Sequence, residues 1–396
     1  MNIGIITISG SDNYGCSLQT YAVIKAYEKL GHKALLIPDT TRVGGVKATY
    51  QRQSKLSKLS PAYMTSVLKV RLSNKYMLKN QRDRLLSAII NHKNNAPLFA
   101  KAKKERREAF NKFSDTYIPK TDYSVSKDEL PMERLSEFDF FSVGSDQVWN
   151  PTYPHTSELR FLTFAKSSQK LCFAPSFGIS ELPEYVKEPY SEWLSDFPSL
   201  SVREEKGAEI IKELTGKEAE VICDPTLTLS REEWEAIEKK PDFTTNNPYA
   251  LTYFLGNETN EYRKYIEKIT KEKGLEVINL FDIREPQHYC VDPAEFVYLV
   301  HHADSVFTDS FHCAVFSIIF EKSFVVFDRV ENGRSMGSRL KTLLGKFDLT
   351  DRLFTSVKNN NTFDPINFNS SRLVIDNERE KALGFLAESI RKNTAL

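Results

Sequence analysis

Apolar runs of strand length alternate with helical patterns from the start of the chain. Residues 3–8 form a continuous apolar run, and residues 18–30 then carry apolar side chains at helical spacing. Gly31 ends this helical pattern, and residues 34–37 form a second apolar run. A strand, a helix and a second strand in this order predict parallel pairing with a right-handed crossover.

The same alternation returns in the second half of the chain. Ser230 and Glu233 have the spacing of a capping box, residues 260–273 are amphipathic up to Gly274, and residues 377–392 predict a last amphipathic helix. Strands that alternate with helices favour a doubly wound parallel sheet in each half. The further predicted strands are residues 138–143, 171–174, 200–202, 221–223, 249–255, 276–280, 305–308 and 324–327.

The length of 396 residues predicts two domains, since a domain usually has ~100–200 residues. Proline-rich residues 182–198 mark the expected junction, which divides the chain into an N-terminal domain over 1–185 and a C-terminal domain over 186–375. Residues 376–396 are assigned to the final helix. Within the first domain, residues 42–112 lack strand signals and are strongly basic, so they predict a helical insertion.

Composition narrows the class of protein. The net charge of +1 gives the whole chain no bias toward nucleic acid, and no stretch approaches the ~20 apolar residues of a spanning helix. The five scattered cysteines include no CxxC pair, which favours reduced thiols in the cytoplasm over a disulfide framework or a zinc site. The basic insertion is the one local charge bias, and it predicts either contact with an anionic membrane surface or a solvated helical hairpin.

Ligands of open parallel sheets bind beyond the carboxyl ends of the strands. In the first half this rule selects residues 9–15, a glycine-containing loop before a helix, and residues 143–151, where Asp146, Gln147, Trp149 and Asn150 follow the strand 138–143. A carboxylate there can accept a proton from a sugar hydroxyl, and an indole can stack on a sugar ring. The structural alternatives are a plain turn in the first case and a capped turn with a core tryptophan in the second.

In the second half the rule selects Arg203 and the segment 308–316. Arg203 follows an apolar strand and precedes a helix, a position suited to gripping phosphate or carboxylate, although a surface Arg–Glu pair is the plainer interpretation. His312 falls in the first turn of an apolar helix capped by Asp309 or Ser310. The helix dipole does not stabilise a cation there, so function is favoured over a structural histidine. His301 and His302 lie at a helix end, where cations are stabilised, and are interpreted as structural.

Several stretches together resemble the polysaccharide pyruvyl transferases: NIGIITISGSDNYGCSLQTYA, FFSVGSDQVWNP, FAPSFG, LSVREEKG, VICDPTLTL, ADSVFTDSFHCAVFSIIF and SRLKTLL. One departure is Cys313, where the family usually has glycine after the histidine. The resemblance implies a GT-B-like α/β fold, with two Rossmann-like domains facing a cleft. It also implies pyruvyl transfer from phosphoenolpyruvate to two hydroxyls of one sugar in a cell-surface glycan or its precursor, which gives a cyclic ketal and phosphate.

Two other functions fit the same segments. One is a GT-B glycosyltransferase that uses a nucleotide sugar, and the other is a non-catalytic sugar- or anion-binding protein of the same fold. No Asp-x-Asp pair occurs, so the metal–diphosphate site of one glycosyltransferase class is not expected. The expected partners are phosphoenolpyruvate and a sugar acceptor, with a lipid-linked acceptor as one form, and no metal, cofactor or nucleic acid.

Roles follow from the needs of ketal formation, which are a general acid, a cationic clamp and a base. His312 is assigned as the acid or as a phosphate ligand, Arg203 as the clamp, and Asp12 or Asp146 as the base. The donor is expected on the C-terminal domain and the acceptor on the N-terminal domain. The predicted donor site adds Ser310, Phe311, Arg334, Ser338 and Arg339, and the predicted acceptor site comprises Asn13, Tyr14, Ser145, Asp146, Gln147 and Trp149.

Overall fold

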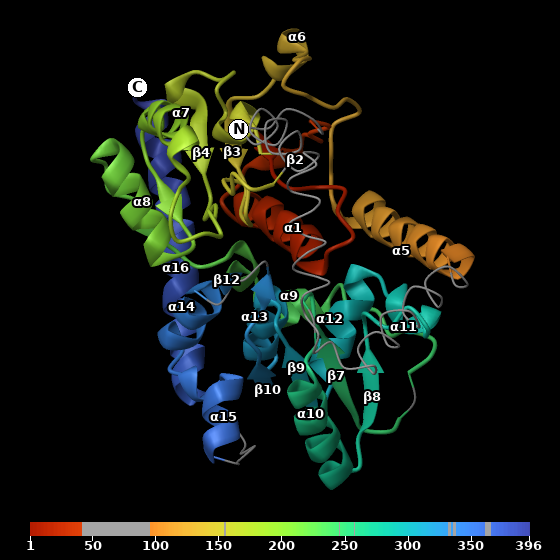
Figure 1. Ribbon diagram of the computed structural model, residues 1–396. Coiled ribbons are helices and arrows are strands. Elements are labelled where there is room, and N and C mark those ends of the chain that lie inside the picture. Colours follow the sequence, from red (N-terminus) through yellow and green to blue (C-terminus); the bar gives the residue numbers. More distant parts are fainter. Residues whose placement is uncertain are drawn as a thin grey trace, which may run out of the picture.

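The first domain is built on a four-stranded parallel sheet (Figure 1). The computed structural model describes residues 1–41, 96–153, 156–244, 246–256, 258–331, 334–335, 338–360 and 366–396. The strands lie in the order β2-β1-β3-β4, with Ile3 of β1 facing Ala34 of β2 and Phe140 of β3. Their bounds are β1 Asn2–Ile6, β2 Lys33–Leu36, β3 Phe140–Val143 and β4 Lys170–Cys172.

The second domain repeats this topology. Its parallel strands lie in the order β10-β9-β7-β8, so in both sheets the first strand in sequence lies between the second and the third. Their bounds are β7 Tyr249–Tyr253, β8 Glu276–Asn279, β9 Ser305–Thr308 and β10 Ser323–Val326. Two parallel, helix-covered sheets confirm the expected GT-B-like α/β class.

The expected domain boundary at residue 185 needs correction. Helices α7 (Glu184–Ser195) and α8 (Glu205–Thr215) bury Val186, Leu194 and Ile211 in the same apolar cluster as Phe141 of the first sheet. Strands β5 (Ser201–Val202) and β6 (Glu220–Val221) pair with each other beside β4. The proline-rich segment forms a helix that covers the first sheet, because its apolar side chains fit that core, and the first domain therefore continues to β6.

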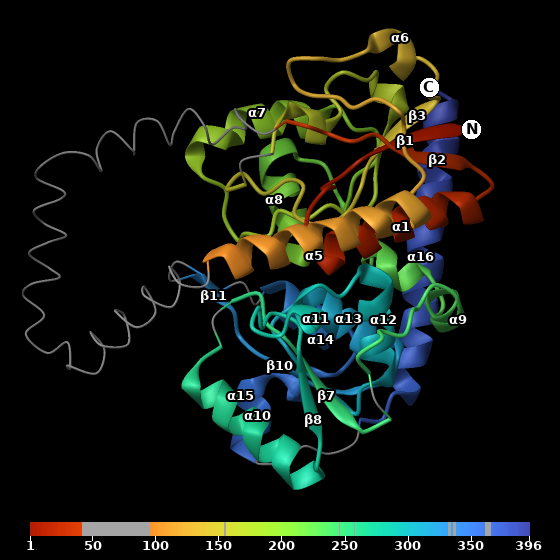
Figure 2. The same ribbon diagram turned by 90° about the vertical axis from the view of Figure 1, so that its right-hand side faces the viewer.

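Helix α5 (Ala96–Tyr117) is the described part of the expected basic insertion; residues 42–95 lie outside the described chain. It runs across the junction of the two domains beside α1 (Tyr14–Lys29) (Figure 2). Phe110 and Phe113 are buried. The buried guanidinium of Arg106 donates to the carbonyl of Asp12 at 2.9 Å, to the hydroxyl of Tyr14 at 3.0 Å, and to the carbonyl of Tyr289. The helix is thus part of the domain junction.

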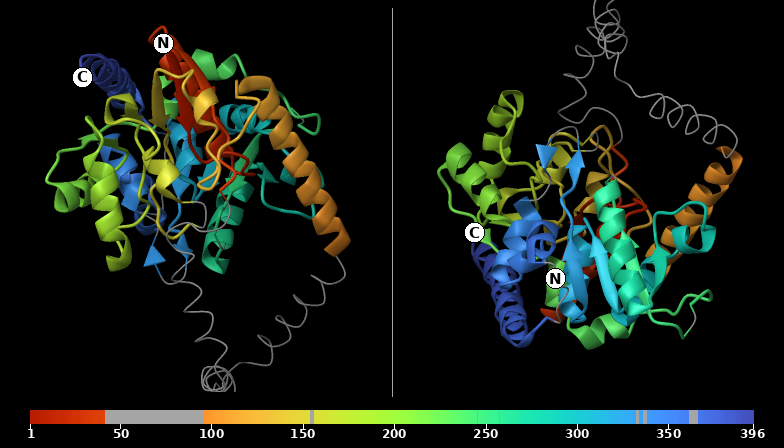
Figure 3. Two further views of the ribbon diagram at one scale, coloured as in Figure 1. Left: turned by 90° about the horizontal axis from the view of Figure 1, so that it is seen from above. Right: turned by 60° about the horizontal axis from the view of Figure 1, so that its bottom comes forward.

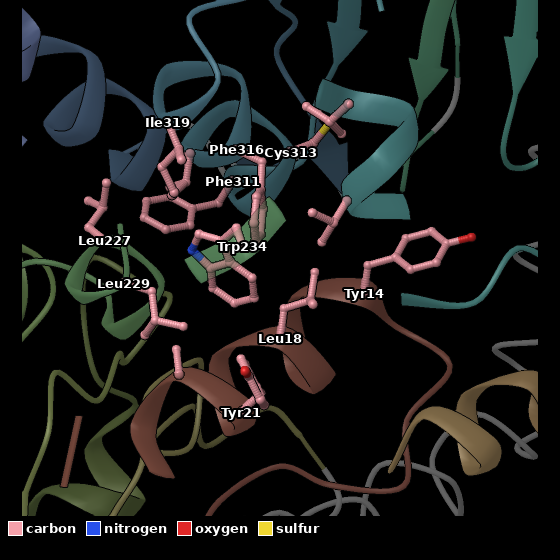
Figure 4. Packing of buried hydrophobic residues seen from close by; sticks show 14 of the residues in the cluster. Tyr14, Leu18, Tyr21, Leu227, Leu229, Trp234, Phe311, Cys313, Phe316 and Ile319 are labelled. Atoms are coloured by element: carbon pink, nitrogen blue, oxygen red, sulfur yellow. The ribbon is translucent and has the colours of Figure 1, made fainter. Parts of the chain in front are cut away.

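An apolar cluster joins the domains. Tyr14 and Leu18 of α1 belong to one buried cluster with Trp234 and Phe316 of the second domain (Figure 4). Phe296 of the second domain belongs to the same cluster, and its ring stacks on that of Tyr14 with centroids 4.4 Å apart. A large apolar interface of this kind opposes free relative motion of two domains.

The last helix, α16 (Asn369–Thr394), is longer than expected and also spans the junction. Its beginning lies on the second domain, and near its end Asn393 donates to the carbonyl of Lys170 in the first domain at 2.9 Å. Both chain ends consequently lie at the first domain (Figures 1 and 3).

No helix among the described residues is both long and apolar enough to cross a membrane.

Several shorter elements complete the fold. The capping box of Ser230 and Glu233 at the start of α9 is confirmed. The remaining elements are α6 Met132–Leu135, η1 Glu158–Phe161, η2 Ser167–Gln169, η3 Pro225–Thr228, α9 Arg231–Glu235, α10 Asn260–Lys273, α11 Pro286–Tyr289, α12 Pro293–His302, α13 Phe311–Ile319, β11 Val330–Glu331, β12 Arg334–Ser335, α14 Ser338–Lys346, η4 Thr350–Arg352 and α15 Phe354–Asn360.

Candidate active site

A cavity of about 410 Å³ lies between the domains, where strands of both sheets end. The segments after β1, β3, β7 and β9 all contribute to it. In the first sheet β1 and β3 are neighbours, and in the second sheet β7 and β9 are neighbours. At each of these places the strand order reverses its direction, and open α/β sheets bind ligands at such a topological switch point. The cavity is lined by Ile8, Ser11, Asn13, Cys16, Asp146, Gln147, Tyr153, Leu255, Asp309, Ser310, Phe311, His312, Arg329, Arg339 and Leu340.

His312 lies in the cavity wall on the first turn of α13. Ser310 is the N-cap of this helix, and its hydroxyl accepts from the amide of Cys313 at 3.4 Å. His312 is buried, and its imidazole packs against the backbone of Gly15 in the first domain, where an added Cβ would lie 2.1 Å from Nδ1. The absence of a side chain at residue 15 therefore creates the space that the imidazole occupies.

Asp224 is a buried carboxylate behind His312. Its Oδ2 lies 3.5 Å from Nε2 of His312 and 2.5 Å from Nη1 of Arg203, while its Oδ1 accepts from the amide and hydroxyl of Thr226. The 3.5 Å contact is at the outer limit of a hydrogen bond, and it is an ion pair only when the imidazole is protonated. Burial alone would raise the pKa of Asp224, but His312 and Arg203 outweigh it and hold the pKa far below its usual range. Asp224 is therefore ionised at neutral pH.

Asp146 presents a second carboxylate to the cavity from the loop after β3. Its φ of 69° is unusual for a residue other than glycine, and such strain often accompanies functional positions. The thiol of Cys16 donates to its Oδ2 at 3.0 Å, while Arg203 and Arg339 lie 3.6 and 4.0 Å from its Oδ1. Burial acts to raise the pKa of Asp146, but the charges of Arg203, His312 and Arg339 lower it overall.

The structure corrects the expected position of Arg203. Its guanidinium is absent from the cavity wall and lies behind it, on the first domain. It covers the ring of Phe311 at 4.3 Å from the centroid and contacts the carboxylates of Asp146 and Asp224. This placement suits a residue that positions the two carboxylates.

The guanidinium groups that do line the cavity belong to Arg329 and Arg339, and the imidazole of His312 lines it with them. Both arginines are at most 9% exposed. Burial, followed by the nearby charge of Arg203, lowers the pKa of Arg339. Asp309 also lines the cavity, its two carboxylate oxygens accept from the amides of Leu255 and Gly256 at 2.7 and 2.8 Å, and burial raises its pKa. The cavity thus combines two guanidinium groups with an imidazole and separate carboxylates.

Three of the expected first-domain residues lie elsewhere. Trp149 is fully buried, with its ring stacked on Phe161 at 5.4 Å and its indole N–H donating to the carbonyl of Arg160. Tyr14 is also fully buried, and its hydroxyl donates to the carbonyl of Val291. Neither ring faces the cavity, which corrects their expected contact with a sugar. Asp12 does not line the cavity either, and its carboxylate pairs with Arg107.

The other expected residues are divided between the wall and its surroundings. Asn13, Gln147, Ser310, Phe311 and Arg339 line the cavity. Ser145 lies one layer behind, where its hydroxyl contacts Asp224 at 3.2 Å. For Arg334 and Ser338 the structure describes the backbone, in β12 and at the start of α14, and their side chains lie outside the description.

The residues of the site that were not selected individually from the sequence include Cys16, Tyr153, Asp224 and Arg329. Asp224 had the clearest signal, since it directly follows the apolar run 221–223 and precedes Pro225. Arg329 lies shortly after β10, separated from it by Phe327 and Asp328. The rule that ligands bind beyond the carboxyl ends of strands therefore applied to both residues. Neither was selected, because no other residue in its short segment pointed to a binding function.

One group with the spacing of metal ligands lies outside the cavity. Among the described residues, Glu238, His301 and His302 bring three ligand atoms within 4.8 Å of one another. His301 contacts Glu238 at 2.8 Å and stacks on Phe320, while Arg231 lies 3.0 Å from its other ring nitrogen. A cation at this position opposes metal binding, and the contacts fit a structural role at a helix end.

The fold and the site together define the class of protein: a two-domain α/β enzyme of GT-B-like architecture, with a charged cavity between its sheets. The family model for polysaccharide pyruvyl transferase matches residues 13–331, and the chain belongs to this family. The match extends from the cap of α1 through Arg203, Asp224 and His312 to β11.

Comparisons with other known proteins are distant. No curated protein matches the sequence. Among solved structures, the UDP-GlcNAc 2-epimerase from Neisseria meningitidis bound to UDP-GlcNAc has 10% identity and a TM-score of 0.47, covering 99% of this chain and 100% of its own. A glycosyltransferase from Rickettsia africae has 11% identity and a TM-score of 0.41, covering 100% of this chain and 96% of its own.

Proposed function

We propose that the chain transfers the pyruvyl group of phosphoenolpyruvate to two hydroxyls of one sugar, forming a cyclic ketal and releasing phosphate. The observation that carries this proposal is that Arg329, Arg339 and His312 line the same cavity. Phosphoenolpyruvate bears two anionic groups, a carboxylate and a phosphate, and guanidinium groups bind both with paired hydrogen bonds. Ser310 at the start of α13 adds the partial positive charge of a helix N-terminus.

The reaction begins with a proton. His312 delivers it to the methylene carbon of phosphoenolpyruvate, which becomes a methyl group and leaves the adjacent carbon electron-poor. A sugar hydroxyl attacks that carbon and loses its proton. The bond to phosphate then breaks, a second hydroxyl of the same sugar attacks, and the ketal closes. Of the two hydroxyl protons released, one restores the acid and the other leaves with phosphate.

Asp146 is the better placed of the two proposed bases. It lines the cavity, whereas Asp12 pairs with Arg107 outside it. Its lowered pKa keeps it ionised but also makes it a weak base. We therefore assign to Asp146 the orientation of a hydroxyl and the acceptance of its proton only as that hydroxyl becomes acidic during attack.

Arg203 and Asp224 support these groups without facing the donor. Asp224 lies against His312 and compensates the charge of its protonated ring, and Arg203 keeps Asp224 and Asp146 in place. This assignment replaces the expectation that Arg203 clamps the donor. Arg339 and Arg329 take that role instead, so the donor would bind mainly on second-domain side chains.

A donor comparison tests the proposal. We expect phosphoenolpyruvate to raise the melting temperature of the wild-type protein and to bind measurably in a calorimeter, while UDP-sugars do neither. Arg339→Gln should weaken phosphoenolpyruvate binding by roughly tenfold or more, the effect of losing one buried charged contact. Arg263→Gln, at an exposed arginine on α10, is the matched control and should bind like the wild type. Binding of a UDP-sugar but not phosphoenolpyruvate would instead establish the glycosyltransferase alternative.

A further inference from the structure

A second cavity of about 600 Å³ adjoins the candidate active site. Ile8 and Ser11 line both cavities, so the loop between β1 and α1 forms a shared wall. The far side is formed by the segment after β2 and by one face of α5, from which Asn111 and Ser114 face the cavity. This volume lies within the range of cavities that hold small ligands, ~300–1,000 Å³.

A buried ion pair lies in the wall of this second cavity. Nη2 of Arg160 is 2.9 Å from Oδ2 of Asp39, and both side chains are at most 2% exposed. The pair is not saturated: among the described residues, Nε and Nη1 of Arg160 have no hydrogen-bond partner, and Oδ2 of Asp39 has the contact with Nη2 of Arg160 and no further one. The other oxygen of Asp39 accepts from the amide of Thr41 at 2.8 Å, which fixes the carboxylate.

Such a pair is costly unless something completes it. A buried charge pair gains stability only when further hydrogen bonds satisfy its remaining donors and acceptors. Here the open positions are N–H donors on Arg160 and a carboxylate acceptor on Asp39, side by side. A sugar fits this combination, because each hydroxyl both donates and accepts, so neighbouring hydroxyls can donate to Asp39 and accept from Arg160.

We propose that the second cavity is the acceptor subsite, and that it binds a hexopyranose ring through the Asp39–Arg160 pair. This inference rests on the proposed function for its link to catalysis, since the shared wall at Ile8 and Ser11 places a sugar in this cavity next to the donor. Under this proposal the acceptor is recognised by Asp39 and Arg160, which were not expected from the sequence, instead of by Trp149 and Tyr14, whose rings are buried.

The test uses saturation-transfer NMR with glucose, galactose, mannose and the N-acetylated forms of glucose, galactose and mannose as probes, each at millimolar concentration. Asn111→Trp fills the cavity from its exposed rim without touching the buried pair. Lys112→Trp adds the same side chain at the next residue of α5, which does not line the cavity, and is the matched control. Asp39→Asn keeps the size of the side chain and removes its charge.

At least one hexose should give a signal with the wild-type protein and with Lys112→Trp. We expect that signal to fall at least about fivefold in Asn111→Trp and in Asp39→Asn, because a ring cannot enter a filled site and because Asp39→Asn removes a charged hydrogen bond to the sugar. Asn111→Trp carries the test if Asp39→Asn does not fold. An unchanged signal in Asn111→Trp, or no hexose signal with the wild type, overturns the assignment.

Phosphoenolpyruvate binding, measured on the same samples, separates the two proposals. Asn111→Trp should bind phosphoenolpyruvate like the wild type, because Asn111 lies outside the first cavity. If the wild type binds phosphoenolpyruvate but gives no hexose signal, only the proposal of the acceptor subsite fails. If a hexose signal is lost in Asn111→Trp but phosphoenolpyruvate does not bind the wild type, only the proposal of the donor fails.

Discussion

At the scale of single residues, His312 is the group on which the proposed chemistry depends. It is the one lining imidazole of the described cavity and lies against Asp224. His312→Ala should lower kcat by ~10²–10⁴-fold, the usual loss for a general acid, with a smaller change in donor affinity. Phosphate release that depends on a sugar acceptor measures this, with circular dichroism as the check on folding. Near-normal turnover would show that histidine is not the acid.

Gly15 offers an independent way to disturb the same imidazole. A methyl group at residue 15 collides with the ring of His312, so Gly15→Ala should lower turnover by at least about tenfold through a small displacement of the acid. Gly384→Ala is the matched control, because an added Cβ there meets nothing within 4 Å. Equal activity of the two variants would mean that the position of the ring does not limit the reaction.

The buried Asp224 predicts a specific dependence of stability on pH. Its folded-state pKa is lowered, so its contribution to stability is fully present above the unfolded pKa of ~3.9 and is lost as pH falls below it. Asp224→Asn should destabilise the protein at pH 7 by ~3–5 kcal/mol, because Arg203 loses its closest carboxylate. The difference from wild type should shrink by ~1.4 kcal/mol per pH unit below about pH 4.

Urea unfolding at several pH values measures that difference. Glu213→Gln is a suitable control, since Glu213 is exposed and lies 4.0 Å from Lys187. A constant gap between wild type and Asp224→Asn across the whole pH range contradicts the lowered pKa.

Single residues also mark the limit of sequence-based prediction. The expected Ser310 cap and the position of His312 at the start of α13 agree with the structure, because both follow from local helix rules. The position of Arg203 behind the cavity depends instead on where Phe311 and Asp224 meet it from distant parts of the chain. Whether Trp149 faces a ligand or a core was likewise decided by aromatic neighbours far away in sequence.

At the scale of elements, continuous apolar runs located the strands well. The strand expected at 305–308 agrees fully with β9, and those at 249–255 and 276–280 contain β7 and β8. Buried parallel strands are apolar on both faces, so the signal is strong even over four residues. The prolines of α7 were misleading, because Pro183 only precedes the helix and Pro189 is tolerated within it. The domain to which a helix belongs depends on packing and was not encoded locally.

Helix α5 likewise shows that the local sequence predicts a helix but not what the helix packs against. Its basic residues predicted a peripheral element, but Arg106 is buried between Tyr14 and Tyr289 at 4.7 and 5.0 Å from their ring centroids. Arg106→Ala should therefore lower the free energy of unfolding by ~2–4 kcal/mol, through lost hydrogen bonds and ring contacts.

Chemical denaturation followed by intrinsic fluorescence measures this loss. Lys103→Ala, at an exposed position of the same helix, should stay within ~0.5 kcal/mol of wild type. A similarly small effect of Arg106→Ala would mean that its buried contacts are not made in solution.

At the scale of the whole molecule, the two sheets share one strand order and face each other across the cavity. This repetition explains how the site is assembled: each domain contributes the loops beside its own change of chain direction, and neither contributes a complete site. Asp146 and Cys16 come from the first domain, and His312 and Arg339 from the second. The proposed chemistry therefore depends on the relative position of the two domains, and α1, α5 and α16 make contacts across their junction.

Helix α16 gives this requirement a direct test. Ala382, Leu386 and Ile390 are buried along it, and Asn393 bonds to Lys170 of the first domain. Removing residues 377–396 should expose the groove that these side chains fill and weaken the link between the domains. We expect the single cooperative unfolding transition of the full chain to separate into two in calorimetry.

The triple substitution Ala382→Ser, Leu386→Ser, Ile390→Ser on the full chain keeps the helix length and removes its apolar contacts. It should reproduce the separation, because the coupling arises from packing and not from chain connectivity. Glu380→Ser, at an exposed position of the same helix, should leave the transition unchanged. If the truncated and triply substituted proteins both unfold in one transition, α16 is not required for the coupling, and the contacts of α1 and α5 with the second domain are sufficient.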